Sequence, residues 1–489
     1  NNQWTLKYFW VLSLTICVLT HAHSISPEYK AAVVEYSPQY ETSKVNRTQA
    51  LNIMNNNFDN FEKYIRNASE EGANIILFPE DGLYGAYFYT RQEIFPYLEY
   101  IPDVNPQNHT ETKVIPCDFQ GKEREQSQIL ARASCVAKKF KITLVFNMGE
   151  IRYCSVQTNK NCPSDSRFQY NTLVALSSSG ELVAKYHKSH LYYEPQFDEP
   201  PIPEVVWFES DFGVKFGLLI CFDLMFEEPQ LSLYNTHGIR NFLWSSWWVD
   251  EPPLITGTQV ELARSLSLPS NFLASGIGLS WYNSGSGIYS YGKPLKHWYN
   301  FSAHPLSKMM ISTLQDHPPE LYLTQELIPN SRELTPIGPP TAPTITTFMA
   351  MPGMEFRVNS TSNNLTCSAV VRVSEGNGSG ELFGVYSLNG TYNGLFPAQI
   401  CALVRCFDVE CLTPILESST SFDNFFLSGN FEMEKMFVMY PMVATNHTII
   451  IDPSLYSSRP AIFPNEIQSG ETLVVLNVAL FGLEKHKLS

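Results

Sequence analysis

The sequence predicts two structural parts, an α/β region with layers of helix and sheet, followed by a smaller β-rich region. The first part alternates apolar strand patterns with amphipathic helix patterns, and short connections join them. Its strand patterns are continuously apolar, which is typical of strands buried on both faces. After Asp316 the chain becomes proline-rich. It then alternates short apolar runs with Gly, Asn and Pro, which indicates an all-β fold such as a sandwich.

The α/β elements follow one another in a regular order. The apolar run 31–36 predicts a buried strand, and a helix is predicted next, because apolar residues recur at three- and four-residue steps from Leu51 to Ile65. Gly72 ends this helix. The later predictions are a strand at 73–79, a helix at 124–139 and strands at 141–147, 172–177, 181–188, 214–222, 241–248 and 271–278.

Length and composition exclude several classes of protein. The chain has 489 residues, of which 44% are hydrophobic and 17% are charged, so it is not disordered, collagenous or coiled-coil. Its formal net charge of −15 argues against nucleic acid as a partner, because phosphate binding needs a basic patch. The sequence has no Walker, H-E-x-x-H, C-x-x-C or G-x-S-x-G motif. We therefore expect no metal and no cofactor.

The N-terminal segment has the layout of a secretory signal. Lys7 precedes the apolar run 8–20, and cleavage is expected after Ala22. The run is shorter than the ~20 residues that a transmembrane helix needs, and a short membrane anchor is the alternative. The C-terminal residues are charged, unlike a lipid-anchor signal. Many N-x-S/T sequons add support, so we expect a secreted, extracellular glycoprotein with no stable membrane anchor. The sequons are at Asn46, Asn67, Asn108, Asn300, Asn359, Asn364, Asn377, Asn389 and Asn446.

Three residues that carry chemistry stand at the C-terminal ends of predicted strands, where α/β sheets build their sites. They are Glu80 in LFPED, Lys188 in AKYHKSHLYYE and Cys221 in GLLICFD. Each has an ordinary structural alternative. A cysteine in an apolar strand commonly packs in the core, a glutamate at a strand end commonly caps a turn, and a lysine there commonly lies on the surface.

Together the three residues form a coherent catalytic set. A thiolate attacks carbonyl carbon and needs a nearby proton acceptor, which a buried Glu80 supplies to Cys221. A cation such as Lys188 stabilises both the thiolate and the oxyanion that follows. The backbone N–H of Phe222 is a candidate for the second oxyanion donor. This set predicts acyl transfer through a thioester.

The motifs around these residues resemble a known family. LFPEDGLYG, YHKSHLYYE and ICFD, in this order, resemble the Glu, Lys and Cys motifs of the nitrilase (carbon–nitrogen hydrolase) superfamily. The further segments FQYNTLVALSSSGELVAKYHK, NFLAS and QICALVRC resemble its vanin/biotinidase branch, and the resemblance covers nearly the whole chain after the signal. It implies an αββα sandwich followed by a β-rich accessory domain. The expected boundaries are a signal at 1–22, a catalytic domain at 23–316, a proline-rich linker at 317–347 and a β-rich vanin-type domain at 348–489.

The resemblance also implies an activity, the hydrolysis of a linear carbon–nitrogen amide bond. By motif, Glu80 is then the general base, Lys188 the electrostatic partner and Cys221 the nucleophile. Glu194, six residues after Lys188, matches an acidic position often found beside the site. It is expected to position substrate or to help transfer protons, and a structural ion pair is the alternative.

The substrates in this branch are pantetheine and biotin amides such as biocytin, so the expected partner is a small-molecule amide. Trp247 and Trp248 are candidates for the wall of an apolar substrate pocket, and Trp244 is expected to pack in the core. Two segments depart from the family pattern, Pro269 before the NFLAS strand and the WWVDEPPL loop at 247–254. They leave Glu80, Lys188 and Cys221 intact and put only the identity of the substrate in question. A pantetheinase-like enzyme is favoured, and a biotinidase-like amide hydrolase is the alternative. An alternative of another class is a catalytically silent binding or signalling glycoprotein, and the complete set of Glu80, Lys188 and Cys221 counts against it.

The ten cysteines divide by position. Cys17 lies in the signal, and Cys221 is expected to be a free nucleophile. The remaining eight fit four disulfides in an exported protein, with four cysteines in each domain. Cys154 and Cys162 are close enough to close a short loop, and the other pairings stay open, because eight cysteines allow 105 connectivities. The eight are Cys117, Cys135, Cys154, Cys162, Cys367, Cys401, Cys406 and Cys411.

Overall fold

The computed structural model describes most of the chain between residues 27 and 485. The residues outside this description are 1–26, 106–112, 252–253, 281–282, 318–334, 377–379, 412, 414, 416, 447–449, 452, 454–456, 459–465 and 486–489. The predicted signal, the central part of the predicted linker and the sequons at Asn108 and Asn377 therefore lie outside the described residues.

The first part of the protein contains two six-stranded sheets, and its first sheet is mixed. Parallel pairing joins β1, β2 and β3, while β12, β4 and β5 pair antiparallel. The apolar run 31–34 in β1 is fully buried, as its continuous hydrophobicity predicts. Across the sheet the order is β12 (Lys308–Gln315), β1 (Glu28–Glu35), β2 (Ile75–Leu77), β3 (Thr143–Tyr153), β4 (Arg167–Leu176) and β5 (Leu182–His187).

The second sheet faces the first and supplies the other half of the core. Its strands β7, β8 and β9 are parallel, and β6, β10 and β11 pair antiparallel at the edges. The strands predicted at 241–248 and 271–278 are shorter and end at Ser245 and Ser275. The Ser245 hydroxyl donates to the Phe78 carbonyl of the other sheet at 3.0 Å, which ties the two sheets together. Across the sheet the order is β11 (Lys293–Trp298), β10 (Ser286–Ser290), β9 (Asn271–Ser275), β8 (Asn241–Ser245), β7 (Lys215–Ile220) and β6 (Trp207–Glu209).

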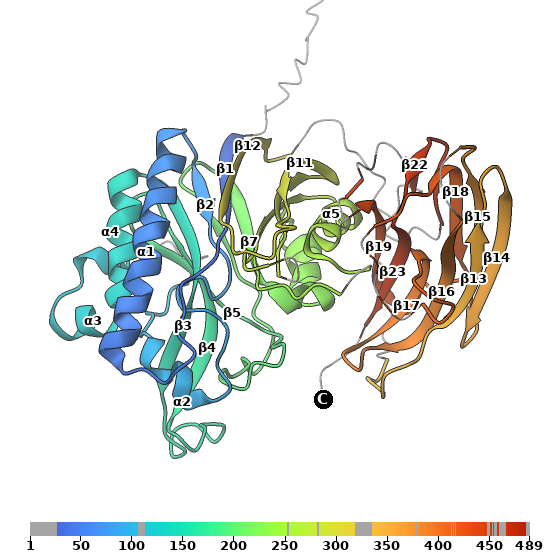
Figure 1. Ribbon diagram of the computed structural model, residues 1–489. Coiled ribbons are helices and arrows are strands. Elements are labelled where there is room, and N and C mark those ends of the chain that lie inside the picture. The colour runs from blue at the N-terminus through green and yellow to red at the C-terminus, as the bar shows by residue number, and fades with distance from the viewer. Residues whose placement is uncertain are drawn as a thin grey trace, which may run out of the picture.

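Helices cover the outer faces of both sheets (Figure 1). The long helix α1 (Arg47–Glu70) and α4 (Gln128–Phe140) pack on the first sheet, and α5 (Gly257–Ser267) packs on the second. The helix predicted at 124–139 is wrong in one respect, because it is interrupted at Ser127, whose hydroxyl donates to the Tyr100 carbonyl at 2.6 Å. The predicted αββα sandwich is confirmed. The shorter elements are α2 (Arg91–Ile94), η1 (Phe95–Tyr97), η2 (Pro116–Asp118), α3 (Gly121–Gln126), η3 (Cys221–Met225) and η4 (Ser232–Thr236).

The second part is a β-sandwich of two antiparallel sheets, as the alternating sequence pattern predicts. Its first strand begins at Thr344, within the segment 317–347 that the sequence assigns to a linker. One sheet has the order β13 (Thr344–Ala350), β16 (Glu381–Tyr392), β17 (Phe396–Arg405), β23 (Asn477–Glu484) and β19 (Met436–Ala444). The other has β14 (Glu355–Ser362), β15 (Leu365–Val373), β18 (Ser421–Gly429), β21 (Glu466–Ser469) and β20 (Ser457–Ser458), and β22 (Leu473–Val474) pairs with β18.

The two parts are packed together through α5, which lies between the second sheet and β19 (Figure 1). The Ser267 hydroxyl donates to the Met439 carbonyl at 2.5 Å, and the Tyr440 hydroxyl donates to the Leu224 carbonyl at 3.1 Å. One hydrophobic cluster runs without interruption from the second sheet into the β-sandwich. The β-rich part is therefore in direct contact with the catalytic part.

Four disulfides join the eight cysteines, two in each part, as the count predicts. Cys154–Cys162 closes the predicted short loop. The pairings left open by the sequence are Cys117–Cys135, Cys367–Cys401 and Cys406–Cys411. Among the described residues, Cys221 is the free cysteine, and it is buried.

Candidate active site

Glu80, Lys188 and Cys221, which are distant in the sequence, lie together at one edge of the two sheets. Glu80 follows β2, Lys188 directly follows β5, and Cys221 directly follows β7. Lys188 Nζ donates to Glu80 Oε1 at 2.7 Å, and both side chains are only 2% exposed. The ordinary explanation of a solvated lysine or a surface cap therefore does not apply to these two residues.

Glu194 completes a buried network with Lys188. The Lys188 ammonium donates to Glu194 Oε2, and the Tyr192 backbone N–H donates to the same oxygen at 3.0 Å. Asn171 on β4 joins the two carboxylates, because its Nδ2 donates to Glu80 Oε1 at 2.7 Å and to Glu194 Oε1 at 2.8 Å. The network thus holds one cation between two carboxylates.

Two asparagines of this site are missing from the sequence prediction. Asn147 Nδ2 on β3 donates to Asn171 Oδ1 at 2.6 Å, and the Asp81 N–H donates to Asn147 Oδ1 at 3.0 Å. The two side chains form a buried relay that ends at Glu80. A single asparagine inside an apolar strand, such as the one in KITLVFN, is the only local signal for such a role. That signal does not distinguish a site residue from a buried structural one.

The charges of the network fix the protonation of the lysine. Burial lowers the pKa of Lys188, but the charges of Glu194 and Glu80 outweigh burial and hold this pKa well above its usual value. Burial raises the pKa of Glu194, and the Lys188 charge opposes that rise. Lys188 is therefore a permanent ammonium that can stabilise negative charge.

Cys221 occupies a sharp turn between β7 and η3. Its backbone has φ 40°, a left-handed conformation that is strained for a residue with a side chain. Asp223 holds this turn, because it accepts the Ile220 N–H at 2.9 Å and the Tyr186 hydroxyl at 2.7 Å. The Trp244 indole N–H donates to the Cys221 carbonyl at 3.0 Å. The turn presents the sulfur to the pocket, and Cys221 lines that pocket.

The backbone of Trp247 contacts both Glu80 and the Cys221 thiol. The Trp247 N–H donates to Glu80 Oε2 at 2.7 Å, and the Cys221 thiol donates to the Trp247 carbonyl at 3.6 Å. Burial raises the pKa of Cys221 well above its usual value; the Glu80 charge raises it further, and the Lys188 charge lowers it. The resting thiol is therefore protonated and needs a base for attack.

The Phe222 N–H lies in the first turn of η3, which begins at Cys221. Amides in the first turn of a helix have no intrahelical acceptor, so this N–H can bind an oxyanion. The Phe222 N–H and the buried Lys188 ammonium are therefore two independent groups that can bind negative charge. The geometry is suited to stabilising a tetrahedral intermediate.

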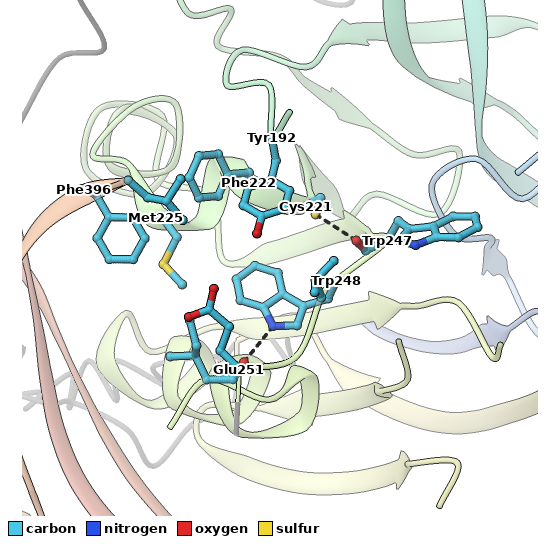
Figure 2. A pocket seen from close by; sticks show the side chains of 11 residues that line it. Tyr192, Cys221, Phe222, Met225, Trp247, Trp248, Glu251 and Phe396 are labelled. Atoms are coloured by element: carbon cyan, nitrogen blue, oxygen red, sulfur yellow. Dashed lines mark hydrogen bonds between the residues drawn. The ribbon is translucent and has the colours of Figure 1, made fainter. Parts of the chain in front are cut away.

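The pocket beside Cys221 has about 360 Å³ of empty space and mostly apolar walls (Figure 2). Trp247 and Trp248, the sequence candidates for the wall of a substrate pocket, line this pocket, and Trp244 is fully buried in the core. Trp247, Trp248, Val249 and Glu251 of the WWVDEPPL segment therefore form a wall of the pocket, whereas Pro269 is not among the lining residues. The lining residues are Tyr192, Cys221, Phe222, Met225, Trp247, Trp248, Val249, Glu251, Ile255, Leu395 and Phe396.

The β-rich part contributes directly to this pocket. Leu395 and Phe396, at the start of β17, lie on its wall, and the ring centroids of Phe222 and Phe396 are 6.2 Å apart. Asn393, two residues before Leu395, donates from Nδ2 to Glu251 Oε2 at 2.5 Å. The sequence gives no sign of these contacts, because they arise only when the two parts pack together.

The described sequons differ in exposure. Asn46, Asn67, Asn359 and Asn364 are exposed, and Asn389 and Asn446 are partly exposed. Asn300 is 1% exposed, and its Nδ2 donates to the His304 carbonyl at 2.8 Å. The atom that would carry a glycan is thus occupied at Asn300 in the folded protein.

Two further features concern metals and membranes. Within the described ranges, no group of three or more His, Cys, Asp or Glu side chains is arranged to hold a metal ion. In the same ranges, no helix is both long enough and apolar enough to cross a membrane.

Family models, related proteins and a solved structure match this chain to different extents. Residues 30–244 match the family model for carbon–nitrogen hydrolases, and residues 341–469 match the model for the vanin C-terminal domain. The chain is 34% identical to a pantetheinase of Mus musculus, over 96% of this chain and 90% of that protein. It is 30% identical to a biotinidase of Takifugu rubripes, over 91% of this chain and 92% of that protein. Among solved structures, an amidase from Nesterenkonia sp. matches with a TM-score of 0.41 and 18% identity, over 60% of this chain and 92% of that chain.

Proposed function

The chain belongs to the vanin/biotinidase branch of the carbon–nitrogen hydrolase family, and we propose that it is a pantetheinase-like enzyme with Cys221 as nucleophile. It is a hydrolase of non-peptide carbon–nitrogen bonds in linear amides. The observation that carries the proposal is the set of contacts that runs from the Cys221 thiol through the backbone carbonyl and N–H of Trp247 to Glu80 and Lys188.

In the first half-reaction Cys221 Sγ attacks the amide carbonyl carbon while Glu80 takes the thiol proton. A base is needed because burial holds the thiol protonated at rest. The Lys188 ammonium and the Phe222 N–H bind the oxyanion. The carbon–nitrogen bond then breaks, the amine leaves with the proton from Glu80, and a thioester remains on Cys221.

In the second half-reaction Glu80 takes a proton from water, and the resulting hydroxide attacks the thioester carbonyl. The same two donors hold the second oxyanion. The carbon–sulfur bond breaks, the acid leaves, and the proton on Glu80 returns to the Cys221 sulfur. Glu194 and Asn171 act as positioning residues, because they fix the ammonium and the base in one geometry.

For the substrate we propose pantetheine, which is cleaved to pantothenate and cysteamine. The long acyl arm fits a mostly apolar pocket walled by Trp247 and Trp248, with few polar groups. The match to a pantetheinase over 96% of this chain supports this choice. A match to a biotinidase makes biocytin the second candidate.

We also propose that the protein is exported and glycosylated. The secretory layout of residues 1–22, four disulfides and exposed sequons such as Asn46 and Asn67 support this. Expression in a cell with a secretory pathway should place the protein in the medium, and a glycosidase should lower its mass. Peptide mapping should find Asn300 without a glycan, because that side chain is buried.

The proposed division of the chain follows the same boundaries as the sequence: a catalytic part at 23–316, a linker at 317–347 and a β-rich part at 348–489. The separate matches at 30–244 and 341–469 support a division into two parts, but the second match and β13, which begins at Thr344, both start within 317–347 and favour an earlier start of the β-rich part. Limited proteolysis should cut within the linker and leave two fragments that stay associated, because α5 and β19 are packed together.

The test of the function compares the unmodified protein with Cys221→Ala on pantetheine and biocytin, with released amine or biotin as the readout. The unmodified protein should release cysteamine from pantetheine and form an acyl-enzyme at Cys221 detectable by mass spectrometry. Cys221→Ala should lose both signals. Turnover in this variant would overturn the assignment, and no product from either amide would favour a binding protein instead.

A further inference from the structure

One pocket residue does not fit an apolar acyl-binding wall. Of the described residues that line the pocket, Glu251 alone carries a carboxylate. Figure 2 shows Trp248 between Glu251 and Cys221. The catalytic steps above make no use of this carboxylate.

The carboxylate of Glu251 is held from two directions. Its own loop fixes the backbone, because the N–H groups of Leu254 and Ile255 donate to the Glu251 carbonyl at 3.2 and 3.3 Å. From the β-rich part, Asn393 Nδ2 donates to Oε2 at 2.5 Å, and the Tyr392 hydroxyl also bonds to the carboxylate. The side chain is therefore pre-positioned at the pocket wall.

This arrangement leaves hydrogen-bonding capacity at the pocket. A carboxylate accepts about four hydrogen bonds, and Asn393 and Tyr392 supply two. Burial raises the pKa of Glu251, which reflects the cost of placing this group among apolar side chains. In mostly apolar pockets, a few placed polar groups orient the ligand and set specificity.

Building on the proposed amide hydrolysis, we propose that Glu251 selects substrates whose acyl arm carries a hydrogen-bond donor. A hydroxyl or N–H on that arm donates to the carboxylate while Cys221 attacks the amide. An aliphatic acyl arm gains nothing from Glu251 and adds no donor to those of Asn393 and Tyr392. The preferred substrates are therefore acyl amides with a polar arm, and the β-rich part takes part in selecting them through Asn393.

The experiment compares two amides with the same leaving amine. Pantetheine carries hydroxyls on its acyl arm, and N-pentanoylcysteamine carries no donor on its acyl arm. Release of cysteamine gives kcat/KM for both in the full-length protein, in Glu251→Leu and in Glu123→Leu. Glu123 is an exposed residue of α3, so its variant is a matched control for charge and size.

The measured quantity is the ratio of kcat/KM for pantetheine to kcat/KM for N-pentanoylcysteamine. In Glu251→Leu this ratio should fall by about ten- to hundredfold, which is the usual range for a lost hydrogen bond to a charged group. Glu123→Leu should keep the unmodified ratio. Glu251→Gln, which keeps an acceptor oxygen, should lower the ratio less and covers the case in which Glu251→Leu does not fold.

Two outcomes would overturn the proposal, and they are distinguishable. An unchanged ratio in a folded Glu251→Leu or Glu251→Gln variant means that Glu251 only holds the β-rich part against the loop. No release of cysteamine from either amide by the unmodified protein would overturn the proposed function, and this inference with it.

Discussion

The two sides of the site are built in different ways. The side that carries Glu80, Lys188 and Glu194 is polar, buried and fully connected by hydrogen bonds within the first sheet and its loops. The side that carries Trp248 and Phe396 is apolar and is assembled from a loop and from the β-rich part. We infer from this comparison that the chemistry depends on groups at the edges of both sheets, whereas specificity depends on packing between two parts of the chain.

The largest expected effect breaks the polar side. Glu80→Gln leaves one oxygen for either Lys188 or the Trp247 N–H, which bond to different oxygens of Glu80, and it cannot take the thiol proton, so kcat should fall by about 10³-fold or more. Stopped-flow and steady-state assays on pantetheine measure the loss. Glu99→Gln alters another buried carboxylate, which binds Arg47 and the start of α4, and should cost stability but not kcat. Equal losses in both variants would argue against a role for Glu80 as base.

A smaller loss of kcat is expected for Asn171, which we propose only positions Glu80 and Glu194. Asn171→Ala removes the donor shared by Glu80 and Glu194, so kcat should fall about ten- to hundredfold with little change in KM. Asn241→Ala removes a different buried asparagine, which bonds to Tyr29, and is the control for stability. A change in KM alone would place Asn171 in substrate binding instead.

Glu80 and Asn171 differ in how far the sequence could predict them. Glu80 stands in a motif at a strand end, so its residue type and its position in the chain together indicate chemistry. Asn171 directly precedes the apolar run TLVALS within β4. An asparagine in such a strand commonly makes a structural hydrogen bond. Its role depends on β3, β4 and the loop of Glu194 meeting, and a single sequence carries no information on such contacts.

The apolar side was still less predictable. Trp247 and Trp248 follow β8, which pairs with β7, the strand before Cys221. Their place in the pocket follows from the pairing of these two strands. Phe396 is 175 residues after Cys221 in the numbering and reaches the pocket only because α5 packs on β19. The fold class of each part could be predicted from local patterns, whereas the contact between the parts could not.

Phe396 gives a sharper test of the apolar side. Phe396→Ala removes a pocket wall supplied by the β-rich part, so KM for pantetheine should rise about three- to tenfold with kcat nearly unchanged. Phe425→Ala removes an equally buried ring from the core of the β-sandwich, away from the pocket, and should lower the melting temperature without changing KM. A large fall in kcat for Phe396→Ala would show that the two sides are not separable.

The last prediction extends the comparison to two buried carboxyls beside which the described part of the chain places no cation. Glu35 accepts bonds from Ser284, Ser286 and the Gly285 N–H, and Glu261 accepts from the Tyr289 hydroxyl. Burial raises the pKa of each to about 8, from 4.5. Between these pH values the unfolded chain ionises these groups while the folded protein keeps them protonated. The folded state therefore binds more protons, and the free energy of unfolding should fall as pH rises from about 4.5 to about 8.

Urea titrations at several pH values measure this dependence. Glu261→Gln should reduce the fall by about 1 kcal/mol per pH unit, because the amide does not titrate in either state. Glu375→Gln changes an exposed glutamate of the β-rich part and should leave the dependence as it is. If Glu261→Gln had the same slope as the unmodified protein, the carboxyl would be ionised when folded. The absence of a cation beside Glu261 would then not explain a difference in protonation between Glu261 and the Glu80–Lys188 pair, in which an ammonium stabilises the carboxylate charge.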